Sequence, residues 1–339
     1  MSKIRIAVLM GGRSGEHEVS LVSGASVAKA LDPERYDVMP ILIAKDGEWS
    51  LDGEPVALVP GSDGVGLIAS LSGGVNRVVD VVFPVLHGPF GEDGTVQGVC
   101  EIAGVPYVGA GVGASAIAMD KAMFKTVARS LHIPVVESIE VYAPQWRANP
   151  GAIRDEINGA LPYPVFVKPA RLGSSVGISR VTGPDELDAA IDEALKHDRK
   201  VLVERGMSGR EVEVGVLGND DLQLSPVGEI KYDNDWYDYD TKYLPGRMEL
   251  HVPADVSLDL SDRLRDVARR AFVAIGCEGM ARIDFFVEDS GDVRVLEINT
   301  IPGFTPTSVY AKLFEAHGIG YNDLVERLVQ LALERGAPA

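Results

Sequence analysis

The sequence predicts an α/β and α+β protein: an open parallel sheet near the N-terminus, then a small central unit, then a C-terminal unit with a mixed sheet. Three observations support this prediction. The chain has 339 residues, and one domain typically has ~150. Residues 4–31 run from an apolar stretch through a glycine-rich turn into an apolar-periodic helix, and residues 282–299 have the pattern of a β-hairpin.

The N-terminal elements are typical of strands that alternate with helices. The apolar run 4–10 predicts a buried strand, the segment Gly11-Gly12-Arg13-Ser14-Gly15-Glu16 a turn, and 19–31 a helix. Further strands are expected at 38–43 and 78–86, with helices between them. In such an open parallel sheet, ligands bind at the carboxyl ends of the strands.

The later elements divide the rest of the chain. In the central part we expect a helix at 115–132, strands at 165–168, 178–181 and 201–204, and a helix at 184–196. The last third alternates strands with helices at 261–275 and 321–334. The predicted domains are residues 1–115, 116–208 and 209–339.

Composition limits the classes of partner. The chain has 50 acidic and 32 basic residues, a net charge of −18, so most of its surface should repel nucleic acids and anionic membranes. An anionic ligand would need local positive charge. The two cysteines, Cys100 and Cys277, are too far apart in sequence to form a paired zinc or disulfide motif. With no leader pattern and no apolar run near the ~20 residues of a membrane span, we expect a cytoplasmic protein.

The strongest chemical signal is the hairpin. Two β-type runs, 282–288 and 293–299, flank the turn Asp289-Ser290-Gly291-Asp292. If Glu288 pairs with Val293, the two-residue period of the strands places four polar side chains on one face. They are Asp284 opposite Glu297, and Arg282 opposite Asn299.

Two opposed carboxylates favour a cation. Directly opposed side chains have Cβ atoms only ~5 Å apart, and like charges at that spacing repel. Asp284, Glu297 and the carbonyl of Asn299 form an all-oxygen set, which favours Mg²⁺ over zinc or copper. The alternative is that both acids are solvated on an open face and pair with Arg282.

Two glycine-rich segments are candidates for ligand binding. The loop 168–177 carries Lys168, Arg171 and small residues that let backbone N–H groups approach phosphate oxygens, although such a loop is more often a simple connection. The segment 11–16 resembles part of a dinucleotide fingerprint, but Met10 occupies the first glycine position and the motif fails.

Several segments together resemble the ATP-grasp superfamily, and within it the D-alanine–D-alanine ligases, along nearly the whole chain. The matching motifs occur in the family's order: the segment 11–20, the loop 87–94, Met119-Asp120-Lys121, Lys168 with 173–177, Tyr237-Asp238-Tyr239 with Lys242-Tyr243, Arg282-Ile283-Asp284, and 297–300 with Pro302-Gly303. Members of this family phosphorylate the carboxylate of one D-alanine with ATP, and the amine of a second D-alanine then attacks the acylphosphate.

The resemblance implies a set of ATP-binding residues, which are Lys121, Lys168, Ser174 and Ser175 for the phosphates, Glu204, Met207 and Glu211 for adenine and ribose, and Phe166 and Phe286 as rings around adenine. It also implies a metal set of Asp284, Glu297 and Asn299, which agrees with the hairpin register. The implied cofactor is Mg²⁺, as two ions for which Mn²⁺ can substitute, with ATP as a substrate.

The resemblance further implies how the amino acids bind. Glu16 would take the ammonium of the first D-alanine and connect through Ser174 to Tyr243, with His87 nearby. Arg282 and the N–H of Gly303 would stabilise the tetrahedral oxyanion. The carboxylate of the second D-alanine would bind at Ser308. The implied protein is a cytoplasmic homodimer that supplies peptidoglycan precursors for the cell wall.

Other functions remain open at this point. A D-alanine–D-lactate ligase or another ATP-grasp carboxylate-amine ligase is the nearest alternative, and Tyr243 favours the amine acceptor because its phenol is neutral at pH 7. The failed glycine motif argues against a dehydrogenase. A catalytically silent nucleotide-binding protein would have lost some of Glu16, Arg282, Asp284, Glu297 and Asn299, which are all present.

Overall fold

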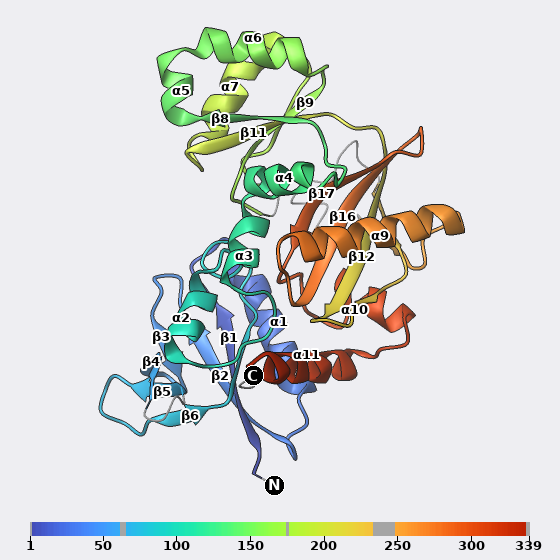
Figure 1. Ribbon diagram of the computed structural model, residues 1–339. Helices are drawn as coiled ribbons and strands as arrows, with labels where there is room; N and C mark the ends of the chain where they lie inside the picture. The colour runs from blue at the N-terminus through green and yellow to red at the C-terminus, as the bar shows by residue number, and fades with distance from the viewer. Residues whose placement is uncertain (1, 62–65, 174–175, 233–247, 337–339) are drawn as a thin grey trace.

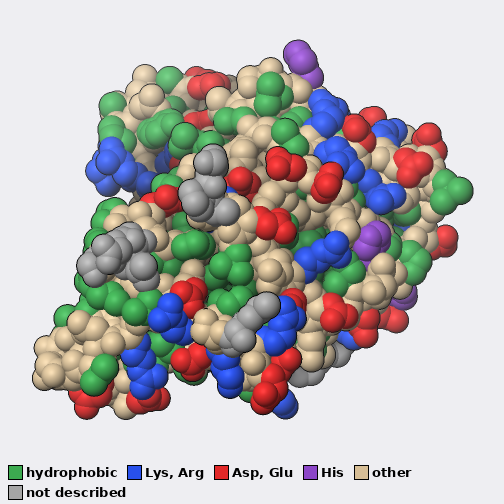
Figure 2. Space-filling view, turned by 60° about the horizontal axis from the view of Figure 1, so that its bottom comes forward, with side chains coloured by type: hydrophobic (Ala, Val, Ile, Leu, Met, Phe, Trp, Pro, Cys, Tyr) green, Lys and Arg blue, Asp and Glu red, His purple; other side chains and the backbone are tan. Residues whose placement is uncertain are grey.

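The computed structural model describes residues 2–61, 66–173, 176–232 and 248–336. Their strands form three sheets, each in its own part of the molecule (Figure 1). None of the helices in these ranges combines the length and apolar character needed to cross a bilayer. Acidic and basic side chains are interspersed on the face shown in Figure 2, where no extended basic patch is visible.

The N-terminal sheet has the strand order β6-β5-β4-β3-β2-β1-β7. Its strands are β1 (Ile4–Gly11), β2 (Tyr36–Ile43), β3 (Trp49–Leu51), β4 (Glu54–Pro60), β5 (Gly66–Ser70), β6 (Arg77–Val79) and β7 (Val81–Pro84). Strand β1 pairs in parallel with β2 and β7, as predicted, whereas β3 to β6 form an antiparallel extension that the sequence analysis missed. The signal was present, because Asp52-Gly53 joins β3 to β4 with both φ angles positive, as a two-residue hairpin turn requires.

Four helices accompany this sheet and lead to the central part of the chain: α1 (His17–Ala30), α2 (Thr95–Ala103), α3 (Val112–Met119) and α4 (Lys121–Ser130). The single helix predicted at 115–132 is wrong, because Asp120 leaves the helical conformation between α3 and α4. Its carboxylate accepts the N–H of Met123 and caps α4. The break places Lys121 at the first position of the new helix.

The central sheet has the order β10-β9-β11-β8. Its strands are β8 (Ser138–Tyr142), β9 (Val165–Pro169), β10 (Ser179–Val181) and β11 (Lys200–Arg205), and its helices are α5 (Ala143–Ala148), α6 (Pro150–Ala160) and α7 (Pro184–Ala194). The helices cover one face of the sheet (Figure 1), where Val165, Val167, Val201 and Val203 are buried with them. By the alternation along β9 and β11, Phe166, Lys168 and Glu204 lie on the other face.

The C-terminal sheet has the order β15-β14-β12-β16-β17, and β13 pairs with β12. Its strands are β12 (Gly209–Gly218), β13 (Gln223–Leu224), β14 (Gly228–Tyr232), β15 (Met248–His251), β16 (Gly279–Glu288) and β17 (Val293–Asn299). Helix α9 (Leu258–Ala274) packs on β12 and β16, and α10 (Val309–Ala316) and α11 (Tyr321–Gly336) follow. The apolar side chains of β12 and β16 face α9, so their polar side chains share the opposite face.

The hairpin β16–β17 differs from its prediction near the turn. Val287 pairs with Val293, so the predicted partner Glu288 is wrong by one residue. A bulge between Asp284 and Phe285 restores the register, and Asp284 lies opposite Glu297 as predicted. Arg282 lies opposite Asn299, which is also confirmed.

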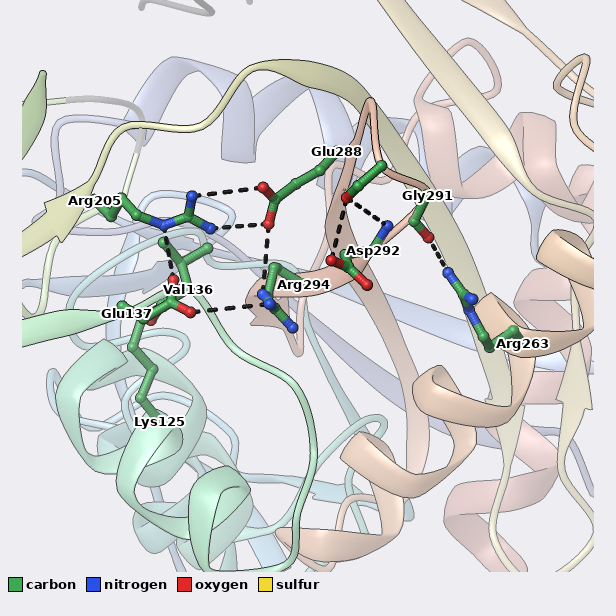
Figure 3. A network of polar contacts seen from close by, with 10 residues as sticks. Lys125, Val136, Glu137, Arg205, Arg263, Glu288, Gly291, Asp292 and Arg294 are labelled. Atoms are coloured by element: carbon green, nitrogen blue, oxygen red, sulfur yellow. Dashed lines mark hydrogen bonds and ion pairs between the residues drawn. The ribbon is translucent and has the colours of Figure 1, made fainter. Parts of the chain in front are cut away.

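Four charged side chains connect the tip of this hairpin to the central sheet (Figure 3). Arg205, which ends β11, donates to Glu137 at 2.9 Å and to Glu288 at 2.8 Å. Arg294 of β17 lies 3.6 Å from Glu288 and 3.9 Å from Glu137. The network thus joins the two sheets that flank the candidate nucleotide site.

The domain boundaries at 115/116 and 208/209 stay a prediction.

Candidate active site

A cavity of about 600 Å³ lies where the three parts of the chain meet. Helix α1, the loop 87–94, helix α4 and the segment that follows β17 all contribute to its walls. Eight residues predicted from the sequence line it: Glu16, His87, Lys121, Arg282, Glu297, Asn299, Gly303 and Ser308. The fold therefore brings together residues that are almost 300 positions apart in the sequence.

Two of the three predicted metal ligands, Glu297 and Asn299, line the cavity, and the third, Asp284, contacts the lining residue Arg282. Arg282 donates two hydrogen bonds of 2.7 Å to the carboxylate of Asp284, and Asn299 Nδ2 donates a third at 2.9 Å. Lys121 Nζ lies 3.0 Å from Glu297 Oε2. Burial would lower the pKa of Lys121, but the negative charges of Glu297 and Glu204 outweigh burial and raise it. Lys121 is therefore protonated at neutral pH.

These oxygen donors fit magnesium. In the described ranges, no group of three or more His, Cys, Asp or Glu side chains is arranged to hold a metal by itself. The predicted set has two carboxylates and one amide. Mg²⁺ is commonly held by one or two carboxylates together with waters and substrate phosphates, so a set completed by a nucleotide fits this ion better than a closed protein cage would.

Glu213 is a buried acid that the sequence analysis did not identify. It lies opposite Asp284 on β12, is 4% exposed, and has Oε2 3.3 Å from Arg282 Nε. Glu213, Asp284 and Glu297 thus form a row across three neighbouring strands. The alternation Glu211-Val212-Glu213 was the available signal, but only the pairing of β12 with β16 shows where it points.

Two loops converge on Glu16, which precedes helix α1. A Cβ atom added to Gly173 would lie 3.4 Å from Glu16 Oε2, and one added to Gly88 would lie 2.9 Å away. Gly88 also has a φ of +73°. Side chains at these positions would crowd Glu16, so glycine keeps its carboxylate accessible from the cavity. Ser14 Oγ accepts the N–H of Glu16 at 3.2 Å and fixes the start of the helix.

His87 and Glu92 belong to the same loop and both contact Ile301. His87 is 5% exposed; its Nδ1 lies 3.1 Å from the carbonyl oxygen of Ile301, and its Nε2 lies 3.3 Å from Ser23 Oγ. Burial lowers the pKa of His87, so the ring is neutral at pH 7. Because a carbonyl oxygen only accepts, Nδ1 carries the proton and donates it. Burial, and then the charge of Glu16, raise the pKa of Glu92 to about 8.

The nucleotide side of the site contains a buried charge cluster. Glu204 is 3% exposed, and its carboxylate forms ion pairs with Lys168 and, at 2.7 Å, with Lys125. Lys125 is fully buried on α4 and also donates to the carbonyl of Val136 at 3.3 Å. Burial would raise the pKa of Glu204, but the two lysines lower it below its usual range. Lys125 was not predicted from the sequence.

The aromatic residues predicted for adenine lie on the expected faces. Phe166 is opposite Glu204 in the pairing of β9 with β11, and Phe286 is opposite Glu211 in the pairing of β16 with β12. Met207 is half-buried in the segment that connects β11 to β12. The two rings lie on the polar faces of the central and C-terminal sheets, and neither ring nor Met207 is among the residues that line the cavity that holds Glu16.

The remaining predicted residues lie in two regions. Ser308 precedes α10, and its Oγ accepts the N–H of Thr305 at 3.0 Å. A Cβ atom added to Gly303 would lie 3.3 Å from that Oγ, so the two residues are neighbours. Ser174, Ser175 and Tyr243 lie outside the described residues.

Comparisons with known proteins agree along the chain. Residues 5–110 match the family described as D-ala D-ala ligase N-terminus, and 127–330 match D-ala D-ala ligase C-terminus. A D-alanine--D-alanine ligase of Deinococcus radiodurans is 51% identical over 98% of this chain and 99% of its own length. One of Geobacillus kaustophilus is 43% identical over 98% of this chain and 95% of its own.

Two solved structures have the same fold. The VanG D-Ala:D-Ser ligase of Enterococcus faecalis has a TM-score of 0.88 and 36% identity, covering 98% of this chain and 100% of that one. The D-alanine-D-alanine ligase of Coxiella burnetii has a TM-score of 0.87 and 34% identity, covering 99% and 95%.

Proposed function

The chain belongs to the D-alanine–D-alanine ligase family, and from this membership we propose how its own residues carry out the reaction. The enzyme has the ATP-grasp fold and is an ATP-dependent ligase that joins two D-alanines into the dipeptide used for peptidoglycan. The observation that carries the assignment of roles is the single cavity in which Glu16, Lys121, Arg282, Glu297 and Gly303 meet.

The first D-alanine binds beside α1. Its ammonium pairs with Glu16, whose carboxylate the glycines at 88 and 173 leave accessible. His87 lines the same wall, and its neutral ring adds no positive charge to compete with the ammonium. Ser174 and Tyr243 would complete a hydrogen-bond network with Glu16.

ATP binds between the polar faces of the central and C-terminal sheets. Lys121 and Lys168 hold its phosphates, with Ser174 and Ser175 closing over them. Its adenine lies between Phe166 and Phe286. The residues that contact adenine and ribose are Glu204, Met207 and Glu211.

Asp284, Glu297 and Asn299 would hold magnesium, as two ions that manganese can replace. The ions would supply positive charge that neutralises the phosphates during transfer. The donor chemistry of these three side chains fits that role, and Lys121 lies 3.0 Å from Glu297 to add a fixed positive charge at the same place.

The second D-alanine binds toward α10, with its carboxylate at Ser308. When its deprotonated amine attacks the carbonyl carbon of the D-alanyl phosphate, negative charge develops on the carbonyl oxygen, and the tetrahedral centre then collapses as the C–O bond to phosphate breaks and inorganic phosphate leaves. Arg282 and Gly303 both line the cavity, and the guanidinium of the first and the N–H of the second stabilise that charge. We also propose that the enzyme works as a homodimer in the cytoplasm, where ATP is available.

An ADP-release assay with D-alanine, combined with product analysis, tests these roles. Wild type should give ADP and D-alanyl-D-alanine, and Glu16→Gln should raise the KM for the first D-alanine far more than the KM for ATP. Equal changes in both constants would contradict the proposed position of the ammonium.

A further inference from the structure

The backbone carbonyl and the backbone N–H of Ile301 both contact side chains of the loop 87–94. Its carbonyl oxygen lies 3.1 Å from His87 Nδ1, and its N–H donates to Glu92 Oε1 at 3.3 Å. The other carboxyl oxygen of Glu92 accepts the N–H of Gly88 at 2.6 Å. Glu92 therefore connects its own loop to a segment 209 positions away in the sequence.

Ile301 belongs to the segment 300–303, which connects two residues with proposed roles. It begins directly after Asn299, a proposed metal ligand, and it reaches Gly303, whose N–H is the proposed oxyanion donor. Residues 299–303 all line the cavity, and Glu92 lines it as well. A shift of Ile301 would therefore move Gly303 relative to Arg282, which is fixed on β16.

We propose that Glu92 is a positioning residue for the ligation step: by holding the N–H of Ile301, it keeps the N–H of Gly303 directed at the developing oxyanion. This inference rests on the role proposed for Gly303 above.

The chemistry of the carboxyl group makes the inference testable. Each oxygen of a carboxyl group keeps a lone pair in both protonation states, so Glu92 accepts both N–H groups whether ionised or neutral. The amide of glutamine has the same size, but its nitrogen only donates. Glu92→Gln therefore leaves either Ile301 or Gly88 with its N–H facing another donor.

Asp93 provides a matched control in the same loop. Its carboxylate also accepts two backbone N–H groups, from Phe90 and Thr95, both at 2.9 Å. Both of these partners lie within the loop and helix of the N-terminal part. Asp93→Asn thus makes the same chemical change without touching the segment 300–303.

The experiment compares wild type, Glu92→Gln and Asp93→Asn in three measurements. We expect Glu92→Gln to lower kcat about 10- to 100-fold, since a misplaced oxyanion donor loses much of its effect. The KM for ATP should stay within about twofold, because the proposed nucleotide contacts lie on other elements. A phosphinate analogue of the tetrahedral centre should bind more weakly by a factor similar to the loss of kcat/KM.

Hydrogen exchange identifies the cause. Glu92→Gln should speed exchange of the amides at Ile301 and Gly303, whereas Asp93→Asn should leave their exchange and kcat near wild type. The proposal is wrong if Glu92→Gln keeps wild-type kcat, or if Asp93→Asn lowers kcat equally. It is also wrong if exchange changes at these amides while binding of the phosphinate does not. Failure of wild type to form the dipeptide would instead refute the proposed function.

Discussion

The ion pair between Lys125 and Glu204 gives a quantitative test of the nucleotide side. Lys125 is 0% exposed and Glu204 is 4% exposed at its side chain, with 2.7 Å between Nζ and Oε1. Breaking a buried ion pair from one side costs about 3–5 kcal/mol, because the remaining charge stays desolvated. In Lys125→Met, Lys168 still pairs with Glu204, so we expect the lower end, about 3 kcal/mol.

A double-mutant cycle with Glu204→Gln isolates the attraction itself. At an effective dielectric constant of about 20, unit charges 2.7 Å apart attract by roughly 6 kcal/mol before desolvation is counted. Desolvation of each ion costs several kcal/mol, and Lys168 shares the carboxylate. We therefore expect a coupling energy of at least about 2 kcal/mol, so that the double variant loses less than the sum of the two single variants.

Native-state hydrogen exchange is a suitable assay, because a chain of several domains does not unfold in two states. The amides of β9 and β11 report the local opening free energy. The exposed pair Lys196–Glu193, 67% and 48% exposed, is the control, and Lys196→Met should change little. Additivity of Lys125→Met and Glu204→Gln within about 0.5 kcal/mol would refute the reasoning.

Three further predictions follow from the site and its surroundings. Glu297→Gln should abolish nearly all ADP formation. Without nucleotide it should melt close to wild type, because loss of the ion pair with Lys121 is offset by relief of the repulsion from Asp284. Activity near wild type at saturating Mg²⁺ would contradict the proposed metal role. Burial raises the pKa of Asp198, but its bonds with Arg171 outweigh burial and lower it, so its stabilisation is complete above the unfolded value of about 3.9 and is lost below that pH. Asp198→Asn should therefore lower the local opening free energy by about 1–2 kcal/mol at pH 7, and hydrogen exchange should show this difference from wild type shrinking as the pH falls below about 3.9. With D-alanine and D-lactate both present from pH 6 to 9, dipeptide should dominate, and substantial depsipeptide at pH 6 to 7 would overturn the role proposed for Tyr243.

Alternation along the strands made the face that carries Asp284 and Glu297 predictable from the sequence. The pairing of Asp284 with Glu297 needed only the two-residue period and a turn of the right residue types. The error at Glu288 arose because a bulge adds one residue to β17, which no local pattern indicates. The shifted pairing at the turn and the bulge cancel at Asp284. The prediction of the polar face is therefore correct, although the prediction of the turn is wrong.

Residues that act through buried contacts between distant segments could not be found in this way. Lys125 lies on a helix whose pattern gives no reason to bury a lysine, and its partner Glu204 is 79 positions away. Glu92 contacts Ile301 only because the N-terminal loop folds against the segment after β17. Tertiary packing determines both contacts, and tertiary packing has no short-range signature in the chain.

The ion pairs of the site explain how a chain with a net charge of −18 can receive a triphosphate. Each proposed phosphate-binding lysine is paired with a site carboxylate, Lys121 with Glu297 and Lys168 with Glu204, and Arg282 is likewise paired with Asp284. An incoming phosphate can take Lys121 while an incoming cation takes Glu297, and Glu204 keeps its ion pair with Lys125 when Lys168 turns to a phosphate, so neither carboxylate is left buried without a partner. Glu213, with Oε2 3.3 Å from Arg282 Nε, would stay as the partner of Arg282 if Asp284 bound the metal. Because the charges of the phosphates and of the cation balance each other within the site, tight binding of ATP should require the cation. Tight binding of the cation should likewise require ATP.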